Sequence, residues 1–207
     1  MEYAVNIINR IKSKDKKTRY KALDEIMKLS RSRKRKQKAE LLKILNEKSF
    51  STEWEERYVS MYGISRYMWR NGKFADLKET YYNVLRLLED ENGRVRVASF
   101  NALGHFRSFF ITFAFGGYSN FDEKEVIKLW MDSLFLLWDK TKSMEKGKKR
   151  YLLIKSVDTL FRPDREGYLN NKEYRKYNEI WDKLQEIEEI YNESRGELCY
   201  QNYHKNY

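Results

Sequence analysis

One arginine recurs along this chain at nearly constant spacing, each time within a segment of similar pattern. The intervals between successive copies are 38, 39 and 54 residues, and the copies are Arg19, Arg57, Arg96 and Arg150. The position seven residues after each arginine is apolar in all four segments, and the position three residues after it is small in three of them. A period near forty, with small residues where helices must approach closely, predicts pairs of helices stacked side by side.

Apolar residues at helical spacing predict the helices themselves. The expected pairs are 3–12 with 16–30, 38–47 with 52–69, 74–89 with 94–115, and 123–142 with 146–161. In the second of these helices Tyr20, Leu23 and Ile26 are expected to face the core. An amphipathic ninth helix over 171–193 is expected to cap the last pair, because the end of a stack otherwise exposes an apolar face. The prediction is an all-α, right-handed α-solenoid of about four helical pairs plus a C-terminal capping helix, with one domain over 1–193 and an aromatic and polar tail over 194–207.

The third segment, LLEDENGRVRVASFNALGHF over 87–106, resembles a HEAT repeat. It has the acidic turn, then Val95 and Arg96, and the closing Ala102, Leu103 and Gly104. The resemblance implies HEAT-like helical pairs that form a scaffold and bind another macromolecule through a concave face of inner helices. HEAT repeats pair the arginine with an aspartate six residues earlier, and this chain offers Asp90 only to Arg96, so an unbroken ladder of such pairs is not expected. The four recurring arginines are interpreted as structural, each bonding a neighbouring carbonyl or carboxylate.

Positive charge is concentrated near the N-terminus. Residues 9–38 carry fourteen lysines and arginines and three acids, an excess of eleven that equals the net charge of +11 of the whole chain. Such a cluster repels itself and attracts polyanions. The candidate binding residues are Lys17, Lys21, Lys28, Arg31, Arg33, Lys34, Arg35, Lys36 and Lys38. An acidic protein is the expected partner and a nucleic-acid backbone the alternative, while a turn that only keeps the chain soluble is the simplest interpretation.

Residues for catalysis are scarce. His105 and His204 lie far apart, Cys199 has no second cysteine, and no HExxH, GxSxG, P-loop or GxGxxG pattern occurs. The usual metal, nucleophile and nucleotide sites therefore lack their residues, and we expect a protein without cofactor, metal or catalytic residues. The alternative is a nucleic-acid-binding enzyme, because HEAT-like alkylpurine DNA glycosylases cradle DNA with Trp, Arg and Asp.

Composition suggests where the protein works. A single cysteine requires no oxidising compartment, the N-terminus lacks a signal pattern, and the longest apolar stretch is shorter than a bilayer span, so a cytoplasmic location is expected. Abundant Lys and Glu with three Gln favour a thermophile source, and fourteen Asn count against it. The aromatic segment over 109–121 is expected to pack inward, the alternative being a protruding contact loop, which leaves a monomer or a weak dimer.

Overall fold

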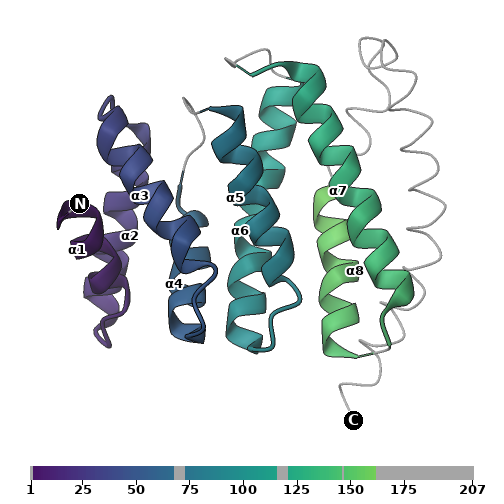
Figure 1. The fold of residues 1–207 in the computed structure, drawn as a ribbon, viewed down its shortest axis with the longest axis horizontal. Coiled ribbons are helices and arrows are strands. Elements are labelled where there is room, and N and C mark those ends of the chain that lie inside the picture. The colour runs from purple at the N-terminus through teal and green to yellow at the C-terminus, as the bar shows by residue number, and fades with distance from the viewer. Residues whose placement is uncertain (1, 68–72, 116–120, 146, 162–207) are drawn as a thin grey trace. The chain divides into compact units, whose positions relative to one another are not determined.

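The computed structural model describes residues 2–67, 73–115, 121–145 and 147–161. Within these ranges the chain forms eight α-helices and no strand, so the all-α prediction is confirmed (Figure 1). The chain divides into two compact units, residues 1–123 and 124–207. The expected capping helix over 171–193 and the tail over 194–207 lie outside the described residues, and the single domain over 1–193 stays a prediction.

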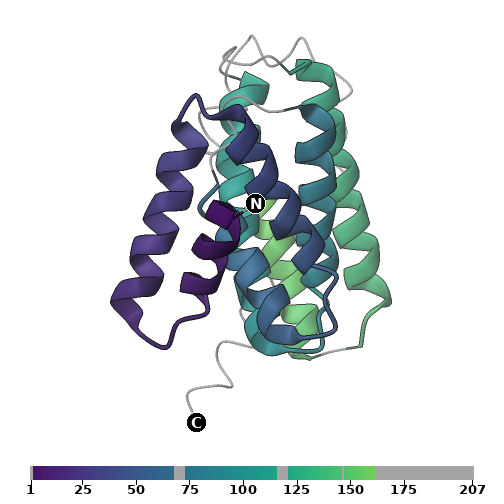
Figure 2. The same ribbon diagram turned by 60° about the vertical axis from the view of Figure 1, so that its left-hand side comes forward.

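The first unit holds six helices that pair in chain order. They are α1 (Glu2–Ile11), α2 (Lys16–Arg31), α3 (Arg35–Lys48), α4 (Trp54–Ile64), α5 (Phe74–Leu87) and α6 (Gly93–Phe115). Each odd-numbered helix packs against the next even-numbered one, α1 and α5 both contact α3, and α4 contacts α6. The chain thus alternates between a first row of α1, α3 and α5 and a second row of α2, α4 and α6 (Figures 1 and 2).

Helix α2 begins where the sequence predicts. Asp15 is its N-cap, and its carboxylate accepts hydrogen bonds from the backbone N–H groups of Lys17 and Thr18 at 3.2 and 2.8 Å. These bonds satisfy donors that lack a partner inside the helix. Leu23 and Ile26 are buried, as expected, whereas the prediction for Tyr20 is wrong, because its side chain is 47% exposed.

Helix α3 begins three residues earlier than predicted. The basic residues from Arg35 onward therefore belong to its first turn, and the connection to α2 is short. Lys38 consequently sits inside the helix with 5% of its surface exposed, and its ammonium group points to the carbonyl of Ser30 at 3.5 Å. A lysine that reaches a carbonyl at the end of α2 complements the negative end of that helix.

The core of the first unit contains a group of aromatic rings. The Tyr81 ring meets Phe106 at a centroid distance of 4.9 Å and Phe110 edge-on at 5.0 Å, and all three side chains are fully buried. Phe109 and Phe121 meet edge-on at 5.8 Å and are also buried. Rings in these arrangements stabilise a core beyond the area they bury. The described rings of the 109–121 segment therefore pack inward.

Three of the recurring arginines share one set of contacts. The Nη1 group of Arg19 donates to the carbonyls of Ser13 and Lys14, at 2.7 and 2.8 Å. Arg57 and Arg96 do the same with the carbonyls six and five residues earlier, at 2.7 to 2.9 Å. Each arginine therefore ties the turn before its helix to that helix.

The Asp90 carboxylate binds a different arginine from the expected Arg96. It binds Arg57 of the preceding pair, through Nε at 2.6 Å and Nη2 at 3.1 Å, whereas Arg96 uses only the backbone carbonyl of Asp90. The side chains of Arg57 and Asp90 are 16% and 5% exposed. The ion pair therefore links the turn before α6 to α4, which places successive helices of the second row.

The second unit contains α7 (Glu123–Ser143) and α8 (Lys148–Phe161) in its described part. Trp130 of α7 is 1% exposed and donates its indole N–H to the carbonyl of Leu160 at 3.2 Å. Leu134, Leu153 and Val157 are buried as well. Arg150, the fourth recurring arginine, lies in the first turn of α8.

Candidate functional site

The predicted binding residues separate into an exposed group and one buried residue. Eight of them have exposed side chains on α2, in the α2–α3 turn and in the first turn of α3, and we call them the basic patch: Lys17, Lys21, Lys28, Arg31, Arg33, Lys34, Arg35 and Lys36. None of the eight forms an ion pair with a carboxylate of the described residues. Lys38, the ninth, is buried and does not share this surface.

The start of α3 combines this charge with unpaired helical donors. Its N-cap is Lys34, which makes no side-chain capping bond, and its first turn contains no acid. Cations are unfavourable at this end, because the free N–H groups and the helix dipole already make it positive. Such an end favours an anion. The start of α3 is therefore less stable than a capped helix end would be, and its surface is strongly positive.

Lys34→Asp is expected to stabilise the protein while weakening anion binding. An aspartate at the N-cap accepts a hydrogen bond from the first turn and complements the dipole, a gain of about 1 kcal/mol in the free energy of unfolding. Urea titration followed by circular dichroism measures that gain. Lys43→Asp, at an exposed position inside the same helix, is the control and should give no gain in stability. A Lys34→Asp variant no more stable than the wild type would contradict the assignment of this helix end.

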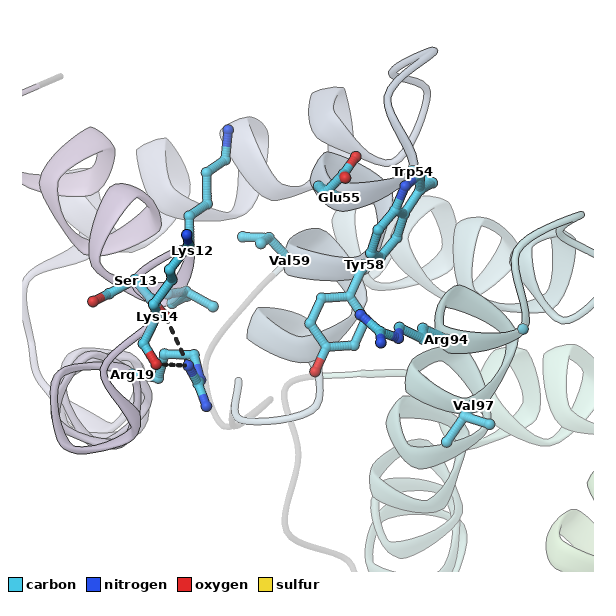
Figure 3. Close-up of a pocket in the computed structure, with 12 residues that line it drawn as sticks. Lys12, Ser13, Lys14, Arg19, Trp54, Glu55, Tyr58, Val59, Arg94 and Val97 are labelled. Atoms are coloured by element: carbon cyan, nitrogen blue, oxygen red, sulfur yellow. Dashed lines mark hydrogen bonds between the residues drawn. The ribbon is translucent and has the colours of Figure 1, made fainter.

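A groove of about 750 Å³ lies among the second-row helices of the first unit. Its walls come from the α1–α2 turn and the N-terminal turns of α2, α4 and α6 (Figure 3). The lining includes four cations, Lys12, Lys14, Arg19 and Arg94, the aromatic residues Trp54 and Tyr58, and the apolar residues Ile11, Val59 and Val97, with Glu55 as the acid. The groove is therefore mainly apolar between cationic sides.

Two arginines flank the tyrosine at the centre of the groove. Figure 3 shows Tyr58 between Arg19 of α2 and Arg94 of α6. Burial and the neighbouring Tyr62 raise the pKa of the Tyr58 phenol, while Arg19 and Arg94 act in the opposite direction. The Tyr58 ring stacks on Tyr62 at 5.6 Å. The phenol thus stays protonated at neutral pH and can donate a hydrogen bond into the groove.

The two groove arginines retain free donors. Arg19 uses Nη1 for the turn carbonyls, and its remaining nitrogens donate to no atom of the described residues. The Arg94 guanidinium lies 5.6 Å from the centre of the Trp54 ring, and it too forms no ion pair within the described residues. Guanidinium groups with free donors are well shaped to receive carboxylates or phosphates.

A tyrosine or valine follows each recurring arginine in the second row of helices. The residue after the recurring arginine is Tyr20 in α2, Tyr58 in α4 and Val97 in α6, and Tyr20 and Val97 are 47% and 54% exposed. Sequence reasoning missed these positions, although their place in the repeat is regular and would have revealed them. Tyr20 and Val97 are therefore exposed at equivalent positions of α2 and α6, and Tyr58 of α4 is partly exposed.

An ion-paired carboxylate underlies one side of the groove. Glu56 accepts hydrogen bonds from the ammonium groups of Lys12 and Lys48, both at 2.6 Å, and so joins α4 to the end of α1 and to α3. The hydrogen bonds from Lys12 and Lys48 lower the pKa of Glu56 to about 2. Lys12 is consequently occupied by this ion pair, whereas Lys14, Arg19 and Arg94 are the other cations of the groove and Glu55 is its acid.

Glu56→Gln is expected to lower the free energy of unfolding by about 1 kcal/mol at neutral pH, since the pairs are partly exposed. The folded pKa of Glu56 is depressed, so its contribution is complete above the ordinary value of 4.5 and disappears as the pH falls toward about 2. Urea titrations of both proteins across this interval, at low and high salt, provide the measurement. A difference in stability that persists undiminished at the acidic end would contradict the ion-pair assignment.

The described residues lack two further features. They contain no group of three or more His, Cys, Asp and Glu side chains that could hold a metal ion. None of the helices in the described part of the chain has the length and apolar character needed to span a bilayer.

Comparisons with known proteins add little to this all-helical arrangement with its cationic groove. No protein family matches the chain, and no curated protein matches it. Among solved structures, the chain is similar to the crystal structure of an engineered protein, with 15% sequence identity and a TM-score of 0.44. That match covers 80% of this chain and 65% of the engineered protein, so the chain spans less than two thirds of its length.

Proposed function

We propose that this protein is a non-catalytic adaptor with a right-handed, HEAT-like solenoid fold, which binds an acidic partner protein through its second helical row and the basic patch. The cytoplasmic location expected from the single cysteine is part of the proposal. The alternation of the first six helices between two rows supports the fold. Adjacent helical pairs of this kind present an extended, rigid surface without a reactive centre.

The observation that carries the proposal is the basic patch. Eight exposed cations lie on α2, in the α2–α3 turn and in the first turn of α3, and none is paired with a described carboxylate. Uncompensated charge of one sign costs stability and speeds encounter with an oppositely charged surface. The lack of a capping bond and of acids at the start of α3 supports a role outside folding.

A nucleic-acid partner is the second candidate, because phosphates suit the same cations. Neutralising six phosphates would give a slope of about −5 in a plot of log K against log salt. A HEAT-like DNA glycosylase activity belongs to this alternative.

Affinity capture from native extract, with and without nuclease, tests the proposal. The baits are the wild type and a variant in which Arg33, Lys34, Arg35 and Lys36 are all glutamate. The proposal expects acidic proteins that resist nuclease on the wild type and are lost from the variant. A variant with Lys124, Lys128, Lys140 and Lys142 of α7 changed to glutamate carries the same charge change and should keep the partner. Nuclease-sensitive capture, or identical capture by all three baits, would refute the proposal.

A further inference from the structure

We infer that the groove holds an extended acidic segment of the partner protein, with two apolar side chains three residues apart, one carboxylate before them and one between them. This inference rests on the proposed function and specifies the ligand at the second helical row. It concerns the groove lined by Arg19, Tyr58, Arg94 and Val97, and not the basic patch.

The apolar part of the inference follows from Tyr58 and Val97. Tyr58 and Val97 line the same groove from α4 and α6, and Val97 is more than half exposed. The partly exposed Tyr58 and the exposed Val97 stand at equivalent positions of neighbouring helices and offer a repeated contact, and tyrosine and arginine are enriched where binding energy is concentrated. Two apolar side chains of a ligand would cover this pair.

Helix spacing sets the distance between those two side chains. Helices that pack directly, as α4 and α6 do, have axes about 8–10 Å apart. In the polyproline II conformation a chain advances about 3.1 Å per residue, and every third side chain returns to the same side. Apolar residues three positions apart are then about 9 Å apart and face the same surface, which matches adjacent helices.

The cations fix the chemistry at the two sides. Lys14 and the free nitrogens of Arg19 lie on one side of Tyr58, and the Arg94 guanidinium lies between Tyr58 and Val97 (Figure 3), while Lys12 is already paired with Glu56. A carboxylate placed before the apolar pair would meet Lys14 and Arg19, and one placed between its two members would meet Arg94. Glu55 also lines the groove, so a neutral or basic residue is favoured opposite it.

The aromatic rings favour a peptide over a nucleic acid. Bases bind by stacking on open ring faces. Here the Tyr58 ring is stacked on Tyr62, and the Arg94 guanidinium lies over the Trp54 ring. One face of each ring is thus occupied, which leaves a base fewer stacking positions, whereas the ring edges and the phenol are suited to a peptide.

A random peptide library displayed on phage, selected against the wild-type protein, identifies the preferred pattern even while the partner is unidentified. Synthetic versions of the selected peptide are then measured by fluorescence anisotropy against four proteins. These are the wild type, Arg94→Glu, Val97→Ser and the matched control Lys78→Glu, an exposed position on α5 in the first row. A peptide with the same composition but its apolar residues adjacent, and oligothymidylate, complete the set of probes.

We expect selection of acidic peptides with apolar residues three positions apart. Arg94→Glu should weaken binding about tenfold or more, Val97→Ser about fivefold, and Lys78→Glu not at all. A peptide with lysine replacing the carboxylate nearest Arg94 should bind Arg94→Glu more tightly than the wild type. Circular dichroism checks that each variant is folded.

Three outcomes would overturn the inference: no enriched pattern, equal binding of the two apolar spacings, or equal effects of Arg94→Glu and Lys78→Glu. If oligothymidylate displaces the selected peptide and binds Arg94→Glu more weakly than the wild type, the ligand of the groove is a nucleic acid and not a peptide. If the peptide results contradict the inference about the groove while nuclease-resistant capture still depends on the basic patch, the proposed adaptor function stands. Nuclease-sensitive capture contradicts the adaptor function itself.

Discussion

Arg57→Met is expected to lower the free energy of unfolding by about 2–3 kcal/mol, the cost of leaving one member of a partly buried ion pair alone. The substitution removes two bonds to the Asp90 carboxylate and two to the carbonyls of Ser51 and Thr52. Asp90 would remain partly buried and charged, with the Asn92 backbone N–H as its described donor. Urea denaturation followed by circular dichroism measures the loss.

Arg96→Met provides the matched control. Arg96 makes the same pair of carbonyl bonds, without a carboxylate, so its loss should cost about 1–2 kcal/mol. Adding Asp90→Asn to Arg57→Met completes a double-mutant cycle, and the double variant should be more stable than the two single losses summed. Strict additivity would contradict the coupling between the two helical pairs.

The same pair predicts a pH dependence. Burial alone would raise the pKa of Asp90, but hydrogen bonds from Arg57 and the Asn92 amide hold it below its ordinary value. A depressed folded pKa gives a contribution that is present above the ordinary value for aspartate and lost as the pH falls through the folded one. The penalty of Arg57→Met should therefore diminish in acid.

The spacing of one residue type predicted much of this fold. The recurring arginines and the apolar positions after them placed the helices of the first three pairs, because turn and helix repeat as one unit. The partner of Asp90 could not be predicted, since Arg57 and Arg96 both lie within reach of its turn and only the packing of α4 against α6 decides. The sequence also predicted the inward packing of Phe109 and Phe110.

The candidate site was predicted only in part. A run of cations is visible in any sequence, so the basic patch was found, but Lys38 was included because the start of α3 was placed too late. Tyr20 and Tyr58 fit the periodicity of a buried helix face, and a single-helix pattern cannot show that the neighbouring helix leaves that face open. Val97 and Arg94 become a site only when the second row places them beside Tyr58.

Trp130→Ala is expected to lower the stability of the second unit by about 3–5 kcal/mol. The indole is 1% exposed and is the largest fully buried side chain among the described residues. Its removal leaves a cavity between α7 and α8 and also removes the bond to the Leu160 carbonyl. Leu136→Ala, at a position that is 39% exposed on α7, should change the free energy of unfolding by less than about 0.5 kcal/mol.

Trp130→Phe separates packing from hydrogen bonding at the same position. A phenyl ring keeps most of the apolar contact but has no N–H, so the Leu160 carbonyl loses a buried donor at a cost of about 1–3 kcal/mol. We therefore expect the order of stability wild type, Trp130→Phe, Trp130→Ala, measured by urea titration followed by circular dichroism. A phenylalanine variant as unstable as the alanine variant would assign the whole loss of stability to the indole N–H. A phenylalanine variant as stable as the wild type would assign none of the loss to that group. We expect an intermediate stability, because the indole both packs against α8 and donates a hydrogen bond to it.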